Sequence, residues 1–155
     1  MQMQFRSFVL ASIAASALAL SGCQTIKGWM GGGKVDLTGA QEVPPVSTAA
    51  KGSANIKVKA DKTVSGSVST SGINGVAAHI HQGASGRNGP VIVPLTKKGD
   101  SEWLVPSGAK LTDAQYEAYK AGELYVNVHS AAHKGGEIRA QIKPQANAPR
   151  SGSTY

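Results

Sequence analysis

Short apolar runs with a period of two recur along the chain, and they restrict its fold more than any other feature. In SANIKVKAD the side chains of Ala54, Ile56 and Val58 alternate with polar residues, as on a strand with one buried face. Asp61-Lys62 follows as a hairpin turn. Further runs bounded by Gly, Pro, Asn or Ser are GVAAHIH, PVIVPL, EWLVP, ELYVNVH and GEIRAQIK. Several short strands at this spacing predict an antiparallel sandwich or barrel.

One segment has the pattern of a helix instead. LTDAQYEAYKAGE has Thr112 at an N-cap position and Gln115 three residues later, which is a capping box. Gly122 follows where a helix can end in the left-handed conformation. Tyr116 and Tyr119 are interpreted as core contacts of this helix. The chain is therefore predicted to be all-β with one short helix before the penultimate strand.

The N-terminus has the features of an export signal. Arg6 precedes an apolar run that ends in LSGC, and this ending resembles a bacterial lipobox. We predict a lipoprotein signal peptide over residues 1–22 and lipidation of Cys23; ordinary secretion with a free thiol is the alternative. Cys23 is the only cysteine, so the fold has no intramolecular disulfide. Gln24 is not the aspartate that commonly retains lipoproteins at the inner membrane, which favours an outer-membrane lipoprotein facing the periplasm.

The rest of the chain divides by composition into three parts. We predict a flexible tether over 23–34, one folded domain over 35–143 and a disordered tail over 144–155. The net charge of +7 comes from scattered lysines without interleaved aromatic residues. A nucleic-acid partner is therefore not expected. The lysines are expected instead to form a solvated surface in the cell envelope.

All four histidines of the chain lie at strand ends or in the loop that follows. His79 and His81 are two apart on one predicted strand, so their side chains project from the same face about 6.5–7 Å apart. His129 ends a later strand, on the face that also carries Tyr125 and Asn127, and His133 lies in the following hairpin loop. Two imidazoles at i and i+2 can bind one metal ion, and this clustering favours a metal site, although periodicity alone does not make the strands neighbours.

Three blocks of the sequence resemble a known family. LTGAQEVPPVSTAAKGSANIKV, GVAAHIHQGASGRNGPVIVPL and AGELYVNVHSAAHKGGEIRAQI together are similar to the CHRD domain, which is named for chordin and is common in bacterial exported proteins. The resemblance covers about residues 36–142 and implies an antiparallel β-sandwich with Greek-key character. More distantly, the histidine strands are similar to the copper-ligand strands of copper/zinc superoxide dismutases. On that similarity His79, His81 and His129 take the places of three copper ligands.

The chain departs from those enzymes in ways that limit the comparison. It has no evident bridging histidine, no acidic zinc-ligand loop and no pair of cysteines for their disulfide. An all-imidazole ligand set favours copper, with zinc as the nearest rival. His133 is interpreted as a fourth ligand, an entry-site ligand or a solvent-exposed loop residue. Glu137 and Arg139 are expected on the exposed face of their strand, where they would orient a ligand imidazole or form cross-strand ion pairs.

The sequence thus predicts a lipid-anchored envelope protein that binds one copper ion for sequestration, delivery or tolerance. Binding is expected to weaken as the pH drops through about 6.5, where free imidazoles gain a proton. One alternative is a metal-free interaction module with a protein partner or as a homodimer. Another is a superoxide dismutase-like redox enzyme. Binding without turnover is favoured, because no further acid, base or substrate pocket is evident in the sequence.

Overall fold

The computed structural model describes residues 33–144. The predicted signal peptide, Cys23, most of the predicted tether and the tail from residue 145 lie outside the described residues. Within the described part of the chain, no helix is long and apolar enough to cross a membrane.

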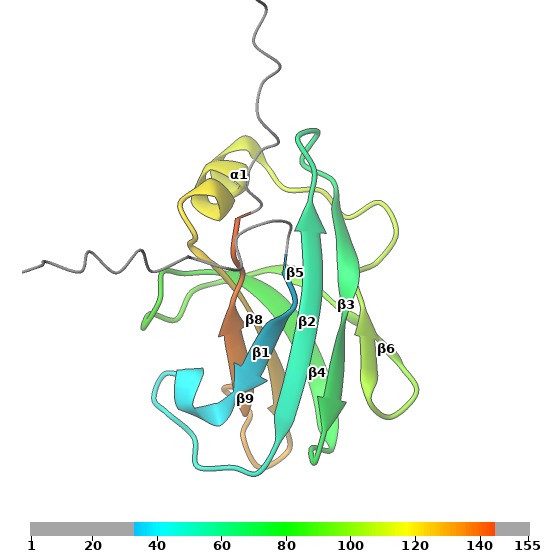
Figure 1. Ribbon diagram of the computed structural model, residues 1–155, viewed down its shortest axis with the longest axis vertical. Coiled ribbons are helices and arrows are strands. Elements are labelled where there is room, and N and C mark those ends of the chain that lie inside the picture. Colours follow the sequence, from blue (N-terminus) through cyan, green and yellow to red (C-terminus); the bar gives the residue numbers. More distant parts are fainter. Residues whose placement is uncertain (1–32, 145–155) are drawn as a thin grey trace, which may run out of the picture.

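The described chain forms one antiparallel sheet and one α-helix (Figure 1). The sheet has nine strands in the order β5-β4-β8-β9-β1-β2-β3-β7-β6. The elements in chain order are β1 (Val35–Thr38), the 3-10 helix η1 (Gly39–Gln41), β2 (Lys51–Val58), β3 (Val64–Ser71), β4 (Gly75–Gln82), β5 (Val91–Pro94), β6 (Thr96–Lys98), β7 (Glu102–Leu104), α1 (Asp113–Lys120), β8 (Leu124–Ser130) and β9 (Ile138–Gln141).

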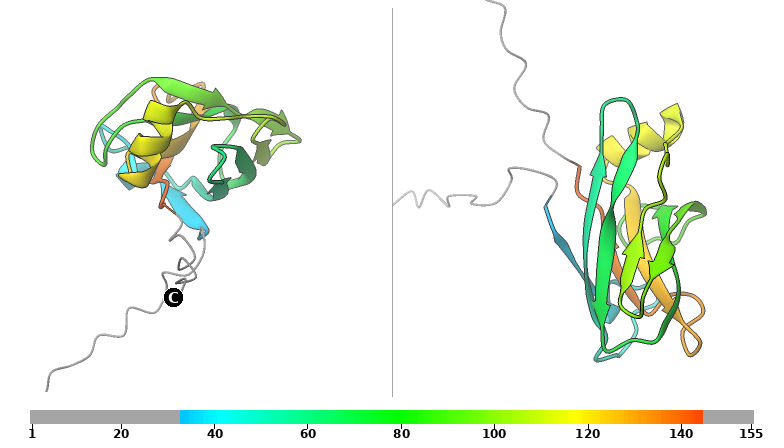
Figure 2. Two further views of the ribbon diagram at one scale, coloured as in Figure 1. Left: turned by 90° about the horizontal axis from the view of Figure 1, so that it is seen from above. Right: turned by 90° about the vertical axis from the view of Figure 1, so that its right-hand side faces the viewer.

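The sheet folds over on itself at the junction of β1 and β9. These two strands share one paired position, Thr38 with Arg139, whereas β2 and β3 are paired along eight residues. The weak junction lets the sheet turn, and two layers result, with β2 and β3 in one and β4 and β8 in the other (Figure 2). The Lys97 ammonium also donates to the Gly75 carbonyl at 2.7 Å, which connects the far ends of the two layers. The predicted antiparallel all-β fold with a helix before the penultimate strand is confirmed.

The core lies between the two layers and is built from the apolar phase of the alternating runs. Ala54, Ile56 and Val58 are buried from one layer, and Ile80 is buried from the other, as the alternation predicts. Trp103 is 2% exposed and lies so close to Gly75 that a Cβ at position 75 would come within 2.9 Å of its ring. The site described below is therefore supported by a closely packed interior.

The predicted helix signals are present in the structure. The Thr112 hydroxyl accepts from the Gln115 amide, and the Gln115 side chain accepts from the Thr112 amide, which completes the capping box. Gly122 follows the helix with φ of 76°, the left-handed conformation expected there. Lys62 has φ of 69° in the turn between β2 and β3, as a hairpin between these strands requires.

Strand β8 departs from the expected alternation, because all seven of its residues are buried. Tyr125, Asn127 and His129 share the face away from the core, and two loops cover the part of it that carries Tyr125 and Asn127. One loop is the segment 39–46 and the other is the segment 83–90, called here the 83–90 loop. The Asn88 side chain joins the two loops by donating to the Val43 carbonyl at 2.7 Å. This covered face carries the polar residues of the candidate site.

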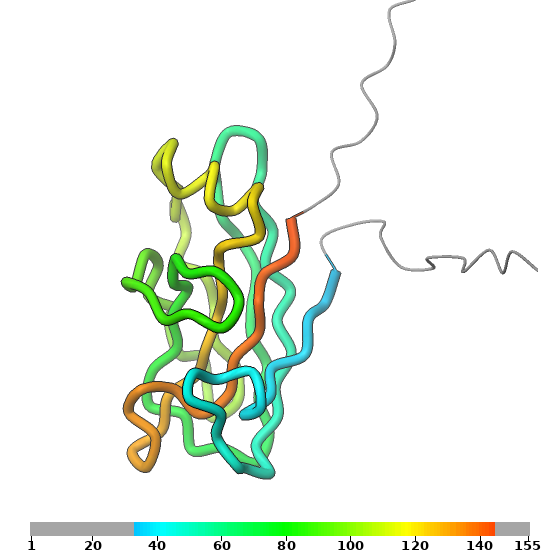
Figure 3. Tube along the Cα trace, turned by 90° about the vertical axis from the view of Figure 1, so that its left-hand side faces the viewer, coloured from blue at the N-terminus to red at the C-terminus, as the bar shows by residue number. Residues whose placement is uncertain are grey.

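The two ends of the described chain lie away from the turn between β8 and β9. In Figure 3 the blue start of β1 and the red segment after β9 are in the upper part of the molecule, and the orange turn is at the bottom. This follows from the antiparallel pairing of β1 with β9, which brings the start of one strand beside the end of the other.

Candidate metal centre

Three of the four histidines meet on the covered face of β4 and β8. The two strands are neighbours, with His79 opposite Asn127, His81 opposite Tyr125 and His129 opposite Ala77. The ring centroid of His129 is 4.8 Å from that of His79 and 6.1 Å from that of His81, and the centroids of His79 and His81 are 5.6 Å apart. The potential ligand nitrogens of the three all lie within 4.8 Å of one another. The predicted convergence of the two histidine stretches is therefore confirmed.

Backbone carbonyls fix the orientation of two of these rings. Nδ1 of His81 is 2.9 Å from the carbonyl oxygen of Gly89, and Nδ1 of His129 is 2.9 Å from that of Lys134. A carbonyl oxygen only accepts, so each Nδ1 carries a proton and donates. The neutral rings of His81 and His129 therefore present Nε2 as an unprotonated lone pair. This is the second-nitrogen arrangement typical of metal-binding histidines.

Both of these lone pairs belong to the same cluster. Nε2 of His81 is buried and has no hydrogen-bond partner among the described residues. Nε2 of His129 is 3.0 Å from Nδ1 of His79, so in the metal-free protein His79 donates a proton to His129. A buried acceptor without a donor costs about 1–3 kcal/mol. A cation bound among the three rings would remove this cost and replace the proton that His79 and His129 share.

The spacing of the nitrogens fits a metal ion after a small adjustment. With metal–nitrogen bonds of about 2.05 Å, the 3.0 Å separation of His79 and His129 corresponds to an angle of about 94° at the ion. Two such ligands on opposite sides of an ion are about 4.1 Å apart. Reaching that separation from the outer limit of 4.8 Å requires a ring movement of at least about 0.7 Å, and more if the two ligands are not on opposite sides of the ion. His79, which is only partly buried, is the ring with the most freedom to make it.

Burial lowers the pKa of all three imidazoles below the usual 6.5. Loss of solvation is the main cause for each ring, and the neighbouring histidines lower the pKa of His79 further. A pKa that is lower in the folded than in the unfolded state destabilises the metal-free fold as the pH falls below 6.5. The same shift keeps the three nitrogens free to bind a cation at pH values where a solvent-exposed histidine is already protonated.

The fourth histidine and the glutamate expected to support the site lie elsewhere. His133 is not in the group of three; its amide donates to the Ser130 hydroxyl, and its carbonyl accepts from Gly136. Its role as a ligand stays a prediction. Glu137 was expected on the exposed face of its strand, but it is buried, and it accepts a 2.7 Å hydrogen bond from Thr48. The carbonyls of Gly89 and Lys134 orient the imidazoles of His81 and His129 instead. The sequence could not reveal these two partners, because every residue type has a backbone carbonyl.

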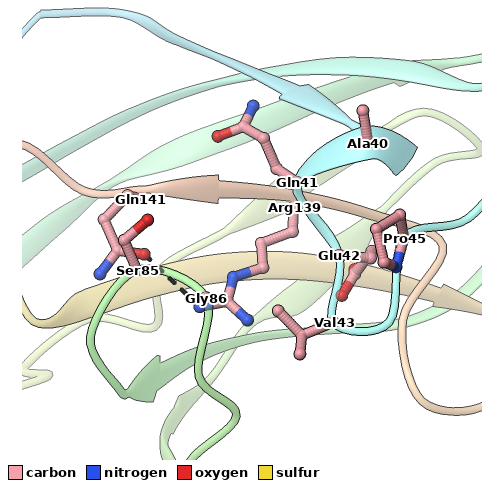
Figure 4. A pocket seen from close by; sticks show the side chains of 9 residues that line it. All are labelled: Ala40, Gln41, Glu42, Val43, Pro45, Ser85, Gly86, Arg139 and Gln141. Carbon is pink, nitrogen blue, oxygen red and sulfur yellow. Dashed lines mark hydrogen bonds between the residues drawn. The ribbon is translucent and has the colours of Figure 1, made fainter.

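Arg139 was expected on the exposed face of β9, but it is 1% exposed. Its guanidinium lies 3.4 Å above the ring centre of Tyr125 and donates to the Arg87 carbonyl at 2.9 Å and to the Asn88 side chain at 3.2 Å. Figure 4 shows Arg139 in the wall of a cavity of about 460 Å³ between the two covering loops. The expected exposure was wrong because the loops enclose this end of the strand, and sequence alternation does not reveal such a cover.

A buried carboxyl group lies next to Arg139 on the same covered face. Glu42 is 4% exposed, and burial raises its pKa from 4.5 to about 7, although the positive charge of Arg139 opposes the shift. Within the described chain its Oε1 atom and Oδ1 of Asn127 have no hydrogen-bond partner. No local sequence pattern indicates this group, because its burial depends on packing between segments far apart in the chain.

We expect Glu42→Gln to stabilise the protein at pH 8 more than at pH 5. The folded-state pKa of Glu42 is raised, so its contribution to stability is complete below 4.5 and is lost as the pH rises through about 7. Glutamine does not ionise, so the gain at pH 8 is at most about 3 kcal/mol. Urea unfolding at the two pH values measures it, with Glu123→Gln at an exposed glutamate as the control. An equal effect of Glu42→Gln at both pH values would contradict this prediction.

Comparison with known proteins identifies one family. The family model of the CHRD domain matches residues 34–142, which is nearly all of the described chain. No curated protein and no solved structure matches. The resemblance of the histidine strands to those of the superoxide dismutases has no counterpart among these findings and stays a prediction.

Proposed function

The chain belongs to the CHRD domain family, and from that premise we propose that it binds a single copper ion through His79, His81 and His129. The observation that carries the proposal is the buried Nε2 atom of His81, which faces two other imidazoles and has no hydrogen-bond partner in the described chain. The ion would be held by Nδ1 of His79 and by Nε2 of His81 and His129, with the proton of His79 moved to its exposed nitrogen.

Copper is favoured over zinc by the donor set. The three ligands are neutral nitrogens, which suit Cu(II), and Cu(II) also has the highest affinity in the divalent series. The bound ion would serve sequestration, delivery or tolerance in the envelope.

The proposal is tested by titrating the purified protein with Cu(II) and following the d–d absorption and the electron paramagnetic resonance spectrum. We expect one Cu(II) per chain, with nitrogen hyperfine coupling from three imidazoles. Competition with zinc in the same sample ranks the two ions. A protein that takes up neither ion at micromolar concentration would leave the metal-free interaction module as the better account.

Copper binding is expected to persist below pH 6.5 and to be lost only as the pH falls further. Protons compete with the ion for the imidazole nitrogens, and the pKa of each of the three rings is lowered by burial. This refines the expectation from unshifted imidazoles, which placed the loss near 6.5. Measuring the Cu(II) dissociation constant between pH 5 and 8 in a non-coordinating buffer tests it. Weakening that begins above pH 6.5 would contradict it.

We also propose that Cys23 carries a lipid and attaches the protein to the outer membrane, facing the periplasm. The LSGC sequence and the absence of aspartate at position 24 support this. In a double-membraned host, Cys23→Ser is expected to move the protein from the outer-membrane fraction to the soluble periplasmic fraction. Fractionation followed by immunoblotting measures the change. Equal distribution of the wild type and the variant would contradict lipid anchoring.

A further inference from the structure

Three of the four hydrogen bonds that Arg139 donates go to one loop. Its guanidinium donates to the carbonyls of Arg87 and Ala84 and to the side chain of Asn88, at 2.9, 3.4 and 3.2 Å. All three acceptors belong to the 83–90 loop. Gln141, the next residue on the same face of β9, donates to the Gly83 carbonyl of this loop at 2.8 Å. Arg139 and Gln141 of strand β9 thus hold the loop at four of its residues: Gly83, Ala84, Arg87 and Asn88.

Tyr125 connects this arrangement to the candidate metal ligand. One face of its ring is covered by the guanidinium of Arg139 at 3.4 Å, and the ring of His81 stacks on it at 4.7 Å with an interplanar angle of 7°. Its hydroxyl accepts from the Gly89 amide at 3.2 Å. The carbonyl of the same Gly89 accepts from Nδ1 of His81. His81 is therefore held by the ring beside it and by the loop residue next to that ring.

We infer that Tyr125 and Arg139 are positioning residues that fix the tautomer and the plane of His81, so that its Nε2 atom is aimed at the metal position. This inference rests on the metal-binding function proposed above. Arg139 acts through the 83–90 loop and Tyr125, and neither residue is a ligand. Arg139 acts on His81 by two routes, because it contacts both the loop that carries Gly89 and the Tyr125 ring that stacks on His81.

The contacts among Arg139, Tyr125 and the 83–90 loop require an arginine and an aromatic ring. A guanidinium is planar, so it can stack on Tyr125 and donate sideways to several loop acceptors at once. A lysine ammonium has the same charge but no plane, and it makes fewer hydrogen bonds in fixed directions. Arg139→Lys therefore retains the buried charge and removes the geometry. Tyr125→Phe retains the stacking ring and removes only the contact with Gly89.

The first test measures Cu(II) affinity in the two variants and in Tyr116→Phe, a matched control on α1. Loss of a group that orients a metal ligand lowers affinity about 10–100-fold. We expect a loss in this range for Arg139→Lys, a loss near its lower limit for Tyr125→Phe and the wild-type value for Tyr116→Phe. Broadened copper resonance lines are expected in Arg139→Lys, because His81 then adopts several orientations. Wild-type affinity and line shape in both site variants would overturn the inference.

The second test needs no metal and separates this inference from the proposed function. In the metal-free wild type, nitrogen-detected NMR should show His81 protonated at Nδ1, with a slowly exchanging Gly89 amide. Arg139→Lys should mix the two His81 tautomers, and both variants should speed exchange of the Gly89 amide. If the wild type binds no copper, these signals still decide the positioning role. Unchanged His81 and Gly89 signals in Tyr125→Phe, which retains the packed ring, together with an unchanged tautomer in a folded Arg139→Lys, would overturn it.

Discussion

Replacing His81 with alanine is expected to lower Cu(II) affinity by at least about 100-fold. Outer partners of metal ligands contribute about 10–100-fold, so the loss of a direct ligand should reach or exceed the upper end of this range. His81 supplies the buried Nε2 atom that has no hydrogen-bond partner in the described chain, and its orientation is set by the Gly89 carbonyl and the Tyr125 ring. The change is measured by competitive titration against a chelator of known affinity, with circular dichroism to confirm the fold.

The same titration on His133→Ala decides the role of the fourth histidine. His133 lies outside the group of three and forms backbone hydrogen bonds within its own turn. Weaker binding in this variant would make His133 a fourth ligand, and unchanged binding would make it a loop residue.

For the first variant, wild-type affinity and an unchanged nitrogen hyperfine pattern in His81→Ala would remove His81 from the site.

Gly89→Ala is expected to destabilise the protein by about 2 kcal/mol or more and also to weaken Cu(II) binding about 10–100-fold. A Cβ at position 89 would lie 1.6 Å from the carbonyl oxygen of Gln82, which is part of strand β4. Since backbone cannot yield cheaply there, the 83–90 loop must move away from the strand. The Gly89 carbonyl that accepts from His81 then moves with it. Thermal unfolding and Cu(II) titration measure the two effects.

Gly86→Ala in the same loop is the matched control. Gly86 has φ of 74°, so alanine there is strained by about 1–2 kcal/mol, but nothing lies within 4 Å of its Cβ position. We expect this variant to lose stability without losing copper affinity. If both variants lose stability and neither loses affinity, the Gly89 carbonyl does not orient His81 in the way described here.

The strands and the helix were predictable from the sequence, because each depends on local patterns, whereas the meeting of the histidines depends on which strands are neighbours. The period of two separates Ile80, which is buried in the core, from His79 and His81 on the other face. The capping box at Thr112 fixes the start of the helix in the same local way. Predicting that β4 pairs with β8 required the family resemblance, because alternation alone does not show which strands are neighbours in the sheet.

The cover over the site was not predictable, and neither were the groups that orient the ligands. Alternation places Tyr125 and Arg139 on a polar face, but the segments 39–46 and 83–90 close over that face. The decisive acceptors are the carbonyls of Gly89 and Lys134, which every residue type has. Glu42 is buried by the same loops, so its raised pKa also depends on long-range packing rather than on its neighbours in the sequence.

The antiparallel pairing of β1 with β9 brings both ends of the described chain together, away from the turn that follows His129. His81 pairs with Tyr125 and Tyr125 with Gln141, so this ring of the cluster lies level with the last residue of β9, and His129 lies toward the opposite end. The turn after His129, rather than the whole cluster, is therefore the part farthest from where the chain enters and leaves the sheet.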